Sequence, residues 1–241
     1  MRSAEPDVAA GFSDLVAIIP ARGGSQRIPR KNIKVFNGKP MIEWPILAAL
    51  ESKVFSRVIV STEDSEIAEV ASQAGAEIPF LRPNDLGGND VGAASVVLHA
   101  IETLALGPSV AVMNIYPTSP LTPNLFRSAV EDFSIDMSRF LISVGRYRTP
   151  VERALTLSAG LMSHQQKSSM HVRSQDLPDS YFDAGKFHIA TARVWRRSET
   201  MMADPFVPFF LPAWATVDID EPDDWQIAEA LHKAFVLERS Q

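Results

Sequence analysis

Residues 21–32, ARGGSQRIPRKN, gather positive charge into one glycine-containing stretch near the start of the chain. Arg22, Arg27, Arg30 and Lys31 lie within it, and it contains no acidic residue. Backbone N–H groups freed by two adjacent glycines can approach an anion closely. The stretch matches neither GxxxxGK[ST] nor GxGxxG, the two commonest phosphate-binding motifs. The pattern leaves open a polyphosphate site, a solvated basic loop and, since aromatic residues are scarce, a less favoured nucleic-acid patch.

A pair of aspartates in VDID (217–220) is the second chemical signal. If residues 214–220 form a strand, Asp218 and Asp220 project to the same side, because side chains two apart share a face. Two carboxylates at the carboxyl end of a strand can hold Mg²⁺, which combines a few protein oxygens with substrate phosphates. The alternative is that Asp220 caps the helix that follows.

The composition excludes several classes of protein and of functional site. The 241 residues carry a formal net charge of −6 and include no cysteine, which excludes disulfides, thiolate catalysis and cysteine-based zinc sites. The acidic balance argues against a general nucleic-acid or membrane-surface binder. We expect no membrane span and no secretory signal, and therefore a cytoplasmic protein. Residues 1–14 are expected to be a disordered tail.

Apolar runs and amphipathic segments alternate along most of the chain. We expect strands at 15–20, 57–62, 76–83, 109–120, 139–148, 187–195 and 214–220, and helices at 39–52, 63–75, 93–107, 122–133 and 221–238. This alternation predicts an α/β fold, a Rossmann-like and mostly parallel sheet with helices on both faces. We expect one domain over 15–241, with the polar stretch 149–184 as a small arm outside the sheet.

The basic stretch directly follows the first expected strand. In open α/β sheets, ligands bind beyond the carboxyl ends of the strands, so this position favours an anion-binding site over a solvated surface loop that binds no ligand.

Longer motifs carry a resemblance to a known family. IIPARGGSQRIPRKNIKVFNGKPMIEW resembles the signature loop of the cytidylyltransferases that activate sialic acids and related nine-carbon acid sugars. The similarity continues in order through VIVSTEDSEIAEVASQAGAEIPFLRP, RSQDLPDSYFDAGKF and VDIDEPDDW. It implies an enzyme that joins CMP from CTP to a 2-keto acid sugar, with Mg²⁺ as cofactor and pyrophosphate as the second product.

The same resemblance implies residue roles. The nucleotide would be bound by Arg22, Gly23, Gly24, Ser25, Lys31, Asn32 and Arg82. Asp218 and Asp220 would bind the metal, and Arg22, Lys31 and Asp218 would act in catalysis. The sugar would meet Tyr116, Arg173 and Gln175. The sequence departs from the family at Gln26, where lysine is usual, and Arg27 is placed to compensate.

Three positions resemble the branch that uses pseudaminic acid. They are Tyr116 in YPTSPL, RIPRKN in the first loop, and DAG in RSQDLPDSYFDAGKF. Lys186 and His188 depart from that branch, at positions expected to contact the sugar. N-acetylneuraminate and legionaminate therefore stay open as acceptors, as does a nucleotide-binding module without turnover. The family also implies a homodimer, with the 149–184 arm completing the partner's site; a local pair of Arg173 with Asp176 or Asp179 is the alternative.

Overall fold

The computed structural model describes residues 12–88, 91–198, 200–201 and 204–238. Residues 1–11 of the expected tail lie outside this range, and the remainder differs from the expectation, because Asp14 already begins the first strand. Phe12 also packs against Phe133, with ring centroids 6.1 Å apart. Within the described residues, no helix is both long and apolar enough to cross a bilayer.

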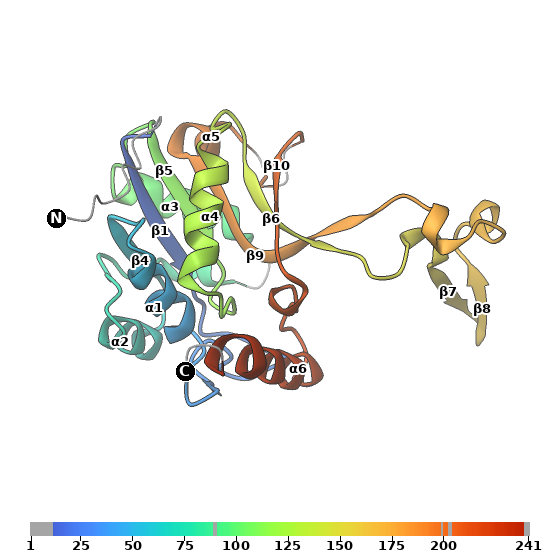
Figure 1. Cartoon of the computed structure of the whole chain (residues 1–241). Helices are drawn as coiled ribbons and strands as arrows, with labels where there is room; N and C mark the ends of the chain where they lie inside the picture. The colour runs from blue at the N-terminus through green and yellow to red at the C-terminus, as the bar shows by residue number, and fades with distance from the viewer. Residues whose placement is uncertain (1–11, 89–90, 199, 202–203, 239–241) are drawn as a thin grey trace.

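A six-stranded sheet in the order β10-β6-β9-β5-β1-β4 forms the centre of the molecule (Figure 1). Its strands are β1 (Asp14–Pro20), β4 (Arg57–Ser61), β5 (Val110–Ile115), β6 (Leu141–Arg146), β9 (Tyr181–Thr191) and β10 (Val207–Phe210). β1 pairs in parallel with β4 and β5, and β10 pairs in parallel with β6. β9 runs antiparallel to both of its neighbours. The predicted mostly parallel α/β sheet is confirmed.

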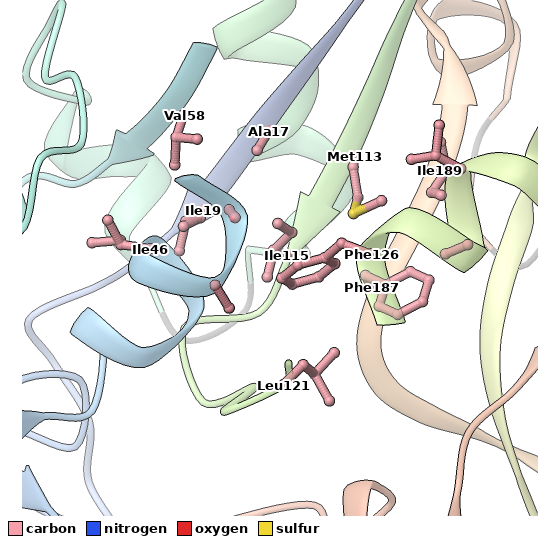
Figure 2. Packing of buried hydrophobic residues seen from close by; sticks show 14 of the residues in the cluster. Ala17, Ile19, Ile46, Val58, Met113, Ile115, Leu121, Phe126, Phe187 and Ile189 are labelled. Atoms are coloured by element: carbon pink, nitrogen blue, oxygen red, sulfur yellow. The ribbon is translucent and has the colours of Figure 1, made fainter. Parts of the chain in front are cut away.

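Helices cover both faces of the sheet. They are α1 (Glu43–Ser52), α2 (Ser65–Gln73), α3 (Ala93–Thr103), α4 (Pro123–Phe133), α5 (Ala192–Arg197) and α6 (Pro222–His232), which continues as a π-helical turn over Lys233–Leu237. Along β1, Ala17 and Ile19 face one apolar cluster with α1 and α4, and Ile18 faces another with α3 and α5. Figure 2 shows the first cluster, where Ile46, Ile115 and Phe126 gather at the sheet. Burial on both faces explains the continuous apolar runs.

A third, smaller cluster joins the basic stretch to the end of the chain. The short strands β2 (Val35–Phe36) and β3 (Lys39–Pro40) pair beside it. Ile28 and Phe36 pack there with Ile219 and Trp225. Ile219 lies between the two candidate metal-binding aspartates and is completely buried, so this apolar contact places VDID next to the basic stretch.

The arm projects from the sheet between β6 and β9 (Figure 1). It holds a hairpin of β7 (Leu155–Ser158) and β8 (Leu161–His164), with short 3₁₀ turns at Val151–Arg153, Lys167–Ser169 and Ser174–Asp176. Its end differs from the predicted bound of 184, because Tyr181 and Phe182 already pair with β6. The excursion therefore spans about 147–180.

Two predicted strands are wrong. Residues 76–83 make one isolated bridge, between Ile59 and Glu77, since Pro79 and Pro83 have no N–H to donate to a ladder. Residues 214–220 form a 3₁₀ turn, Ala213–Ala215, followed by chain that joins no strand ladder. The strand β10 was not expected from the sequence. It contains Pro208 and lies at a sheet edge, where proline is tolerated.

Candidate functional site

A cavity of about 280 Å³ opens beyond the carboxyl ends of β1 and β5. Its walls come from the basic stretch, from residues 82–88 and 91–96, from residues 116–118 and from the aspartate segment. The lining residues are Pro20, Arg22, Ser25, Gln26, Arg27, Ile28, Lys31, Asn32, Arg82, Leu86, Gly88, Val91, Ala93, Val96, Tyr116, Pro117, Thr118 and Asp220. Four of these side chains are cationic and one is a carboxylate, so the cavity suits a strongly anionic ligand.

Lys31 and Asn32, the KN pair of the basic stretch, both donate hydrogen bonds to backbone carbonyls. Lys31 Nζ donates to the Ile219 carbonyl at 2.5 Å and lies 3.4 Å from Asp220 Oδ1. Asn32 is buried and its Nδ2 donates to the Arg22 carbonyl at 2.9 Å. Asn32 thus fixes the shape of the loop as well as lining the cavity. Arg22 reaches across the cavity mouth towards the Gly88 carbonyl at 3.5 Å.

Two acidic residues after β4, which sequence reasoning did not single out, organise this loop. The first is Glu63, whose Oε1 accepts the Gly23 backbone N–H at 2.8 Å. Its other oxygen pairs with Arg82, which is almost fully buried. Burial pushes the pKa of Glu63 upwards, but the Gly23 N–H and the Arg82 guanidinium outweigh it, and the pKa lies below its ordinary value. The Gly23 amide predicted to meet phosphate is therefore bound to a carboxylate in this structure.

The second acid is Asp64, the N-cap of α2. Its Oδ1 accepts the backbone N–H groups of Glu66 and Ile67, each at 3.0 Å. Its Oδ2 lies 2.5 Å from Arg30, which adopts a left-handed backbone with φ 54°. The Arg30 hydrogen bond is the main reason that the pKa of Asp64 lies below its ordinary value. Acids that directly follow a strand end were the signal that could have revealed both residues.

The aspartate segment lies beside the cavity without belonging to a strand. Asp218 is exposed, and no ion pair to it is found in the described part of the chain. Asp220 pairs with Arg27 at 2.8 Å and with Lys31 at 3.4 Å. The proposal that Asp220 caps the last helix is wrong: Glu221 occupies the N-cap, and Asp224 accepts the N–H groups of both Asp220 and Glu221.

Lys186 and His188 lie elsewhere than the sequence suggested. Both are buried, and neither is among the residues that line the cavity. Lys186 Nζ instead donates to the Val217 carbonyl at 2.6 Å. His188 packs edge-on against Tyr116, with ring centroids 5.9 Å apart. The expectation of direct sugar contacts from these two positions is therefore corrected.

Tyr116 does line the cavity, at the end of β5. Burial, with Asp183 and Asp218 nearby, raises the pKa of its phenol to about 12. The phenol is consequently neutral at physiological pH and can both donate and accept a hydrogen bond.

The remaining predicted residues do not line this cavity. Gly23, Gly24 and Asp218 lie next to lining residues in the chain. Arg173 and Gln175 lie on the arm, where Arg173 forms an ion pair with Asp176 at 2.7 Å. This local pair is the alternative left open by the sequence, and within one chain the arm residues do not join the cavity.

The donor set fits a magnesium ion shared with a nucleotide better than a closed protein site. The described residues contain no group of three or more His, Cys, Asp or Glu side chains suited to a metal. Mg²⁺ is usually held by one or two carboxylates together with substrate phosphates and water. Asp218 and Asp220 would supply that number, with Arg27 moving off Asp220.

A family comparison covers most of the chain. The sequence profile described as cytidylyltransferase matches residues 16–202. The chain belongs to the cytidylyltransferase family. The resemblance drawn from the sequence motifs is thereby confirmed.

Individual relatives cover nearly the whole chain. A pseudaminic acid cytidylyltransferase of Campylobacter jejuni is 37% identical over 222 residues, which are 90% of this chain and 96% of the relative. A CMP-N,N'-diacetyllegionaminic acid synthase of Legionella pneumophila is 31% identical over 227 residues, covering 90% and 95%.

A solved CMP:2-keto-3-deoxy-manno-octonic acid synthetase superposes with a TM-score of 0.68 over 92% of this chain and 99% of that one, at 15% identity. A 4-diphosphocytidyl-2C-methyl-D-erythritol synthase of Anaerococcus prevotii gives 0.61 over 90% and 95%, at 11% identity. At these identities the two structures support the fold.

Proposed function

We propose that this cytidylyltransferase transfers CMP from CTP to the anomeric hydroxyl of a nonulosonic acid, with pseudaminic acid as the acceptor. The cationic cavity at the carboxyl edge of β1 and β5, with Asp220 in its wall, is the observation that carries the proposal. The triphosphate would enter between the basic stretch and Arg82. The anomeric hydroxyl would lose its proton to water as its oxygen bonds to the α-phosphorus, and the bond between the α-phosphorus and the α,β-bridging oxygen would break to release pyrophosphate.

The reaction depends on positioning and electrostatics, and it needs no side-chain nucleophile. Arg22 and Lys31 would neutralise the charge that develops on the departing pyrophosphate. Ser25 and Asn32, together with the Gly24 amide, would orient the phosphates. Release of the Gly23 N–H from Glu63 would give one more donor to the triphosphate.

Mg²⁺ would be bound by Asp218 and Asp220 together with CTP. When bound, such an ion withdraws charge from a phosphoryl oxygen and orients the reacting groups. Removal of divalent cations with EDTA should stop pyrophosphate release, and added Mg²⁺ should restore it. Restoration in Asp218→Asn as complete as in the wild type would contradict the assignment of Asp218.

The choice of pseudaminic acid rests on the Campylobacter relative and on the position of Tyr116 at the cavity. The test is pyrophosphate release with CTP, Mg²⁺ and a panel of pseudaminate, legionaminate, N-acetylneuraminate and 3-deoxy-manno-octulosonate. We expect the highest kcat/KM with pseudaminate. A higher value with legionaminate or neuraminate would move the enzyme to those acceptors, and CTP binding without release for any sugar would favour a module without turnover.

We further propose a cytoplasmic homodimer built through the arm. The hairpin exposes apolar side chains, with Leu161 75% and Leu157 63% accessible, and such a patch suits burial against a second copy. In that assembly Arg173 and Gln175 would reach the partner's cavity and exchange the Asp176 pair for the sugar carboxylate. Light scattering of the full chain tests the dimer. Loss of activity in a mixture of Arg173→Ala and Asp218→Ala chains, where one restored site is expected, would contradict arm exchange.

A further inference from the structure

Lys186 is a buried lysine that no role described above uses directly. Only 2% of its surface is accessible, although lysine almost never lies fully inside a protein without a partner. Its Nζ has one hydrogen bond among the described residues, to the Val217 carbonyl at 2.6 Å. Burial lowers the pKa of its ammonium to about 8, with Lys31 acting in the same direction and Asp218 and Asp220 acting against it.

The backbone of Lys186 is held on both sides. Its N–H lies 3.2 Å from Ser143 Oγ on β6. Its carbonyl accepts the Tyr116 N–H at 3.0 Å and the Ser119 hydroxyl at 3.1 Å. The backbone that carries the ammonium group therefore belongs to β9, which lies between two other strands of the central sheet.

The segment that Lys186 contacts joins no strand ladder over residues 216–221. The buried side chain of Ile219 and the carboxylate of Asp224 hold its second half. Two lysines bind its backbone carbonyls: Lys186 donates to Val217 at 2.6 Å, and Lys31 donates to Ile219 at 2.5 Å. These two carbonyls flank Asp218 on either side.

We propose that Lys186 is a positioning residue, which fixes the Val217 carbonyl from the central sheet and thereby holds Asp218 in the segment beside the cavity. The inference has two halves. The catalytic half, that Lys186 affects turnover through Asp218, rests on the proposed function; the structural half, that Lys186 holds residues 216–221, rests on the two carbonyl contacts.

A buried ammonium is a poor stabiliser, because the desolvation penalty opposes the gain from its partners. Replacing it by an apolar side chain of similar length should leave global stability nearly unchanged. The function of the segment should suffer, because residues that orient a metal-binding group typically affect metal affinity or activity roughly 10–100-fold. A positioning role and a structural role therefore predict different results for the same substitution.

The experiment compares Lys186→Met, Lys186→Gln and the exposed control Lys233→Gln in the full chain. Both replacements are one atom shorter than lysine; methionine removes donor and charge, whereas glutamine keeps a neutral donor. Three quantities are measured: the Tm, the amide hydrogen exchange of residues 216–221, and kcat and KM for CTP with Mg²⁺ and the best acceptor.

We expect the Tm of Lys186→Met to stay within about 3 °C of the wild type or above it. Exchange across 216–221 should rise about tenfold, and kcat should fall roughly tenfold or more while the KM for CTP stays within about twofold. Lys186→Gln should recover part of the protection and of kcat, and Lys233→Gln should match the wild type.

Unchanged exchange across 216–221 in Lys186→Met would overturn the inference whatever the activity. A fall in Tm larger than about 3 °C, with exchange rising throughout the sheet, would show a structural lysine instead. Faster exchange at 216–221 with an unchanged kcat would overturn the catalytic half. If Lys186→Met does not fold, Lys186→Gln carries the same comparison, and if no sugar is a substrate, exchange and Tm still decide whether Lys186 holds the segment.

Discussion

Replacing Gly23 by alanine should destabilise the protein, whereas the same change at the neighbouring Gly24 should not. A Cβ added to Gly23 would lie 3.1 Å from Asp64 Cγ and 3.2 Å from Asp64 Cβ, with the carboxylate oxygen closer still. A Cβ on Gly24 would meet nothing within 4 Å. The two glycines are adjacent in the basic stretch, so Gly24→Ala is a matched control.

The size of the effect follows from what Asp64 must give up. Its carboxylate caps α2 through two N–H groups and pairs with Arg30; because its two oxygens belong to one planar group, it cannot turn aside without weakening both the cap and the ion pair. Loss of an N-cap costs about 1 kcal/mol, and a partly exposed ion pair adds up to about 1 kcal/mol. Alanine restricts the unfolded chain more than glycine does, and this effect stabilises the folded state by about 0.4–1 kcal/mol. The expected net loss for Gly23→Ala is therefore about 1 kcal/mol.

Urea unfolding followed by circular dichroism measures this difference, and a thermal melt should show a Tm lower by about 2–4 °C. Gly24→Ala should remain within about 0.5 kcal/mol of the wild type, because it adds no contact and removes one flexible residue from the unfolded chain. Equal stability of the two variants would refute the argument that Asp64 closes the space beside Gly23. So would a double variant, Gly23→Ala with Asp64→Ala, in which the two losses simply add.

Four further outcomes are expected. Glu63→Gln should cost about 3 kcal/mol in urea unfolding and raise the KM for CTP, because it leaves the buried Arg82 without its carboxylate; unchanged stability would contradict this. Burial lowers the pKa of His232 from 6.5 to about 4, so the unfolded chain binds more protons than the folded chain between pH 6.5 and 4. The free energy of unfolding should therefore fall as the pH drops through this range, and this pH dependence should flatten in His232→Asn. Leu161→Arg should give a monomer in light scattering with an unchanged circular dichroism spectrum, and a Tm no higher than that of the wild type, because association stabilises the folded chain; a persistent dimer would place the interface elsewhere. Gln26→Lys should lower the KM for CTP, since residue 26 lines the cavity, and an unchanged KM would mean that Gln26 is a tolerated variation.

Much of the fold was predictable because its signals are local. The apolar run at 15–20 and the run at 57–62 have the composition of strands buried on both faces, and the structure places β1 and β4 there. The predicted segment 63–75 becomes α2, with Asp64 at its start and Gly75 in a left-handed conformation after its end. The basic stretch follows β1 at the carboxyl edge of the sheet, as the alternation of elements required.

The sequence by itself determined the family, the sheet and the edge at which the cationic loop lies, because repeated motifs and hydrophobic periodicity are properties of neighbouring residues. Tertiary structure alone decided which groups those cations meet. Lys31 and Ile219 are 188 residues apart, and Gly23 and Glu63 are 40 apart. Lys186 was expected to face a sugar, yet it lies inside and holds Val217. Such contacts depend on how side chains from distant segments pack together, and no local pattern records that packing.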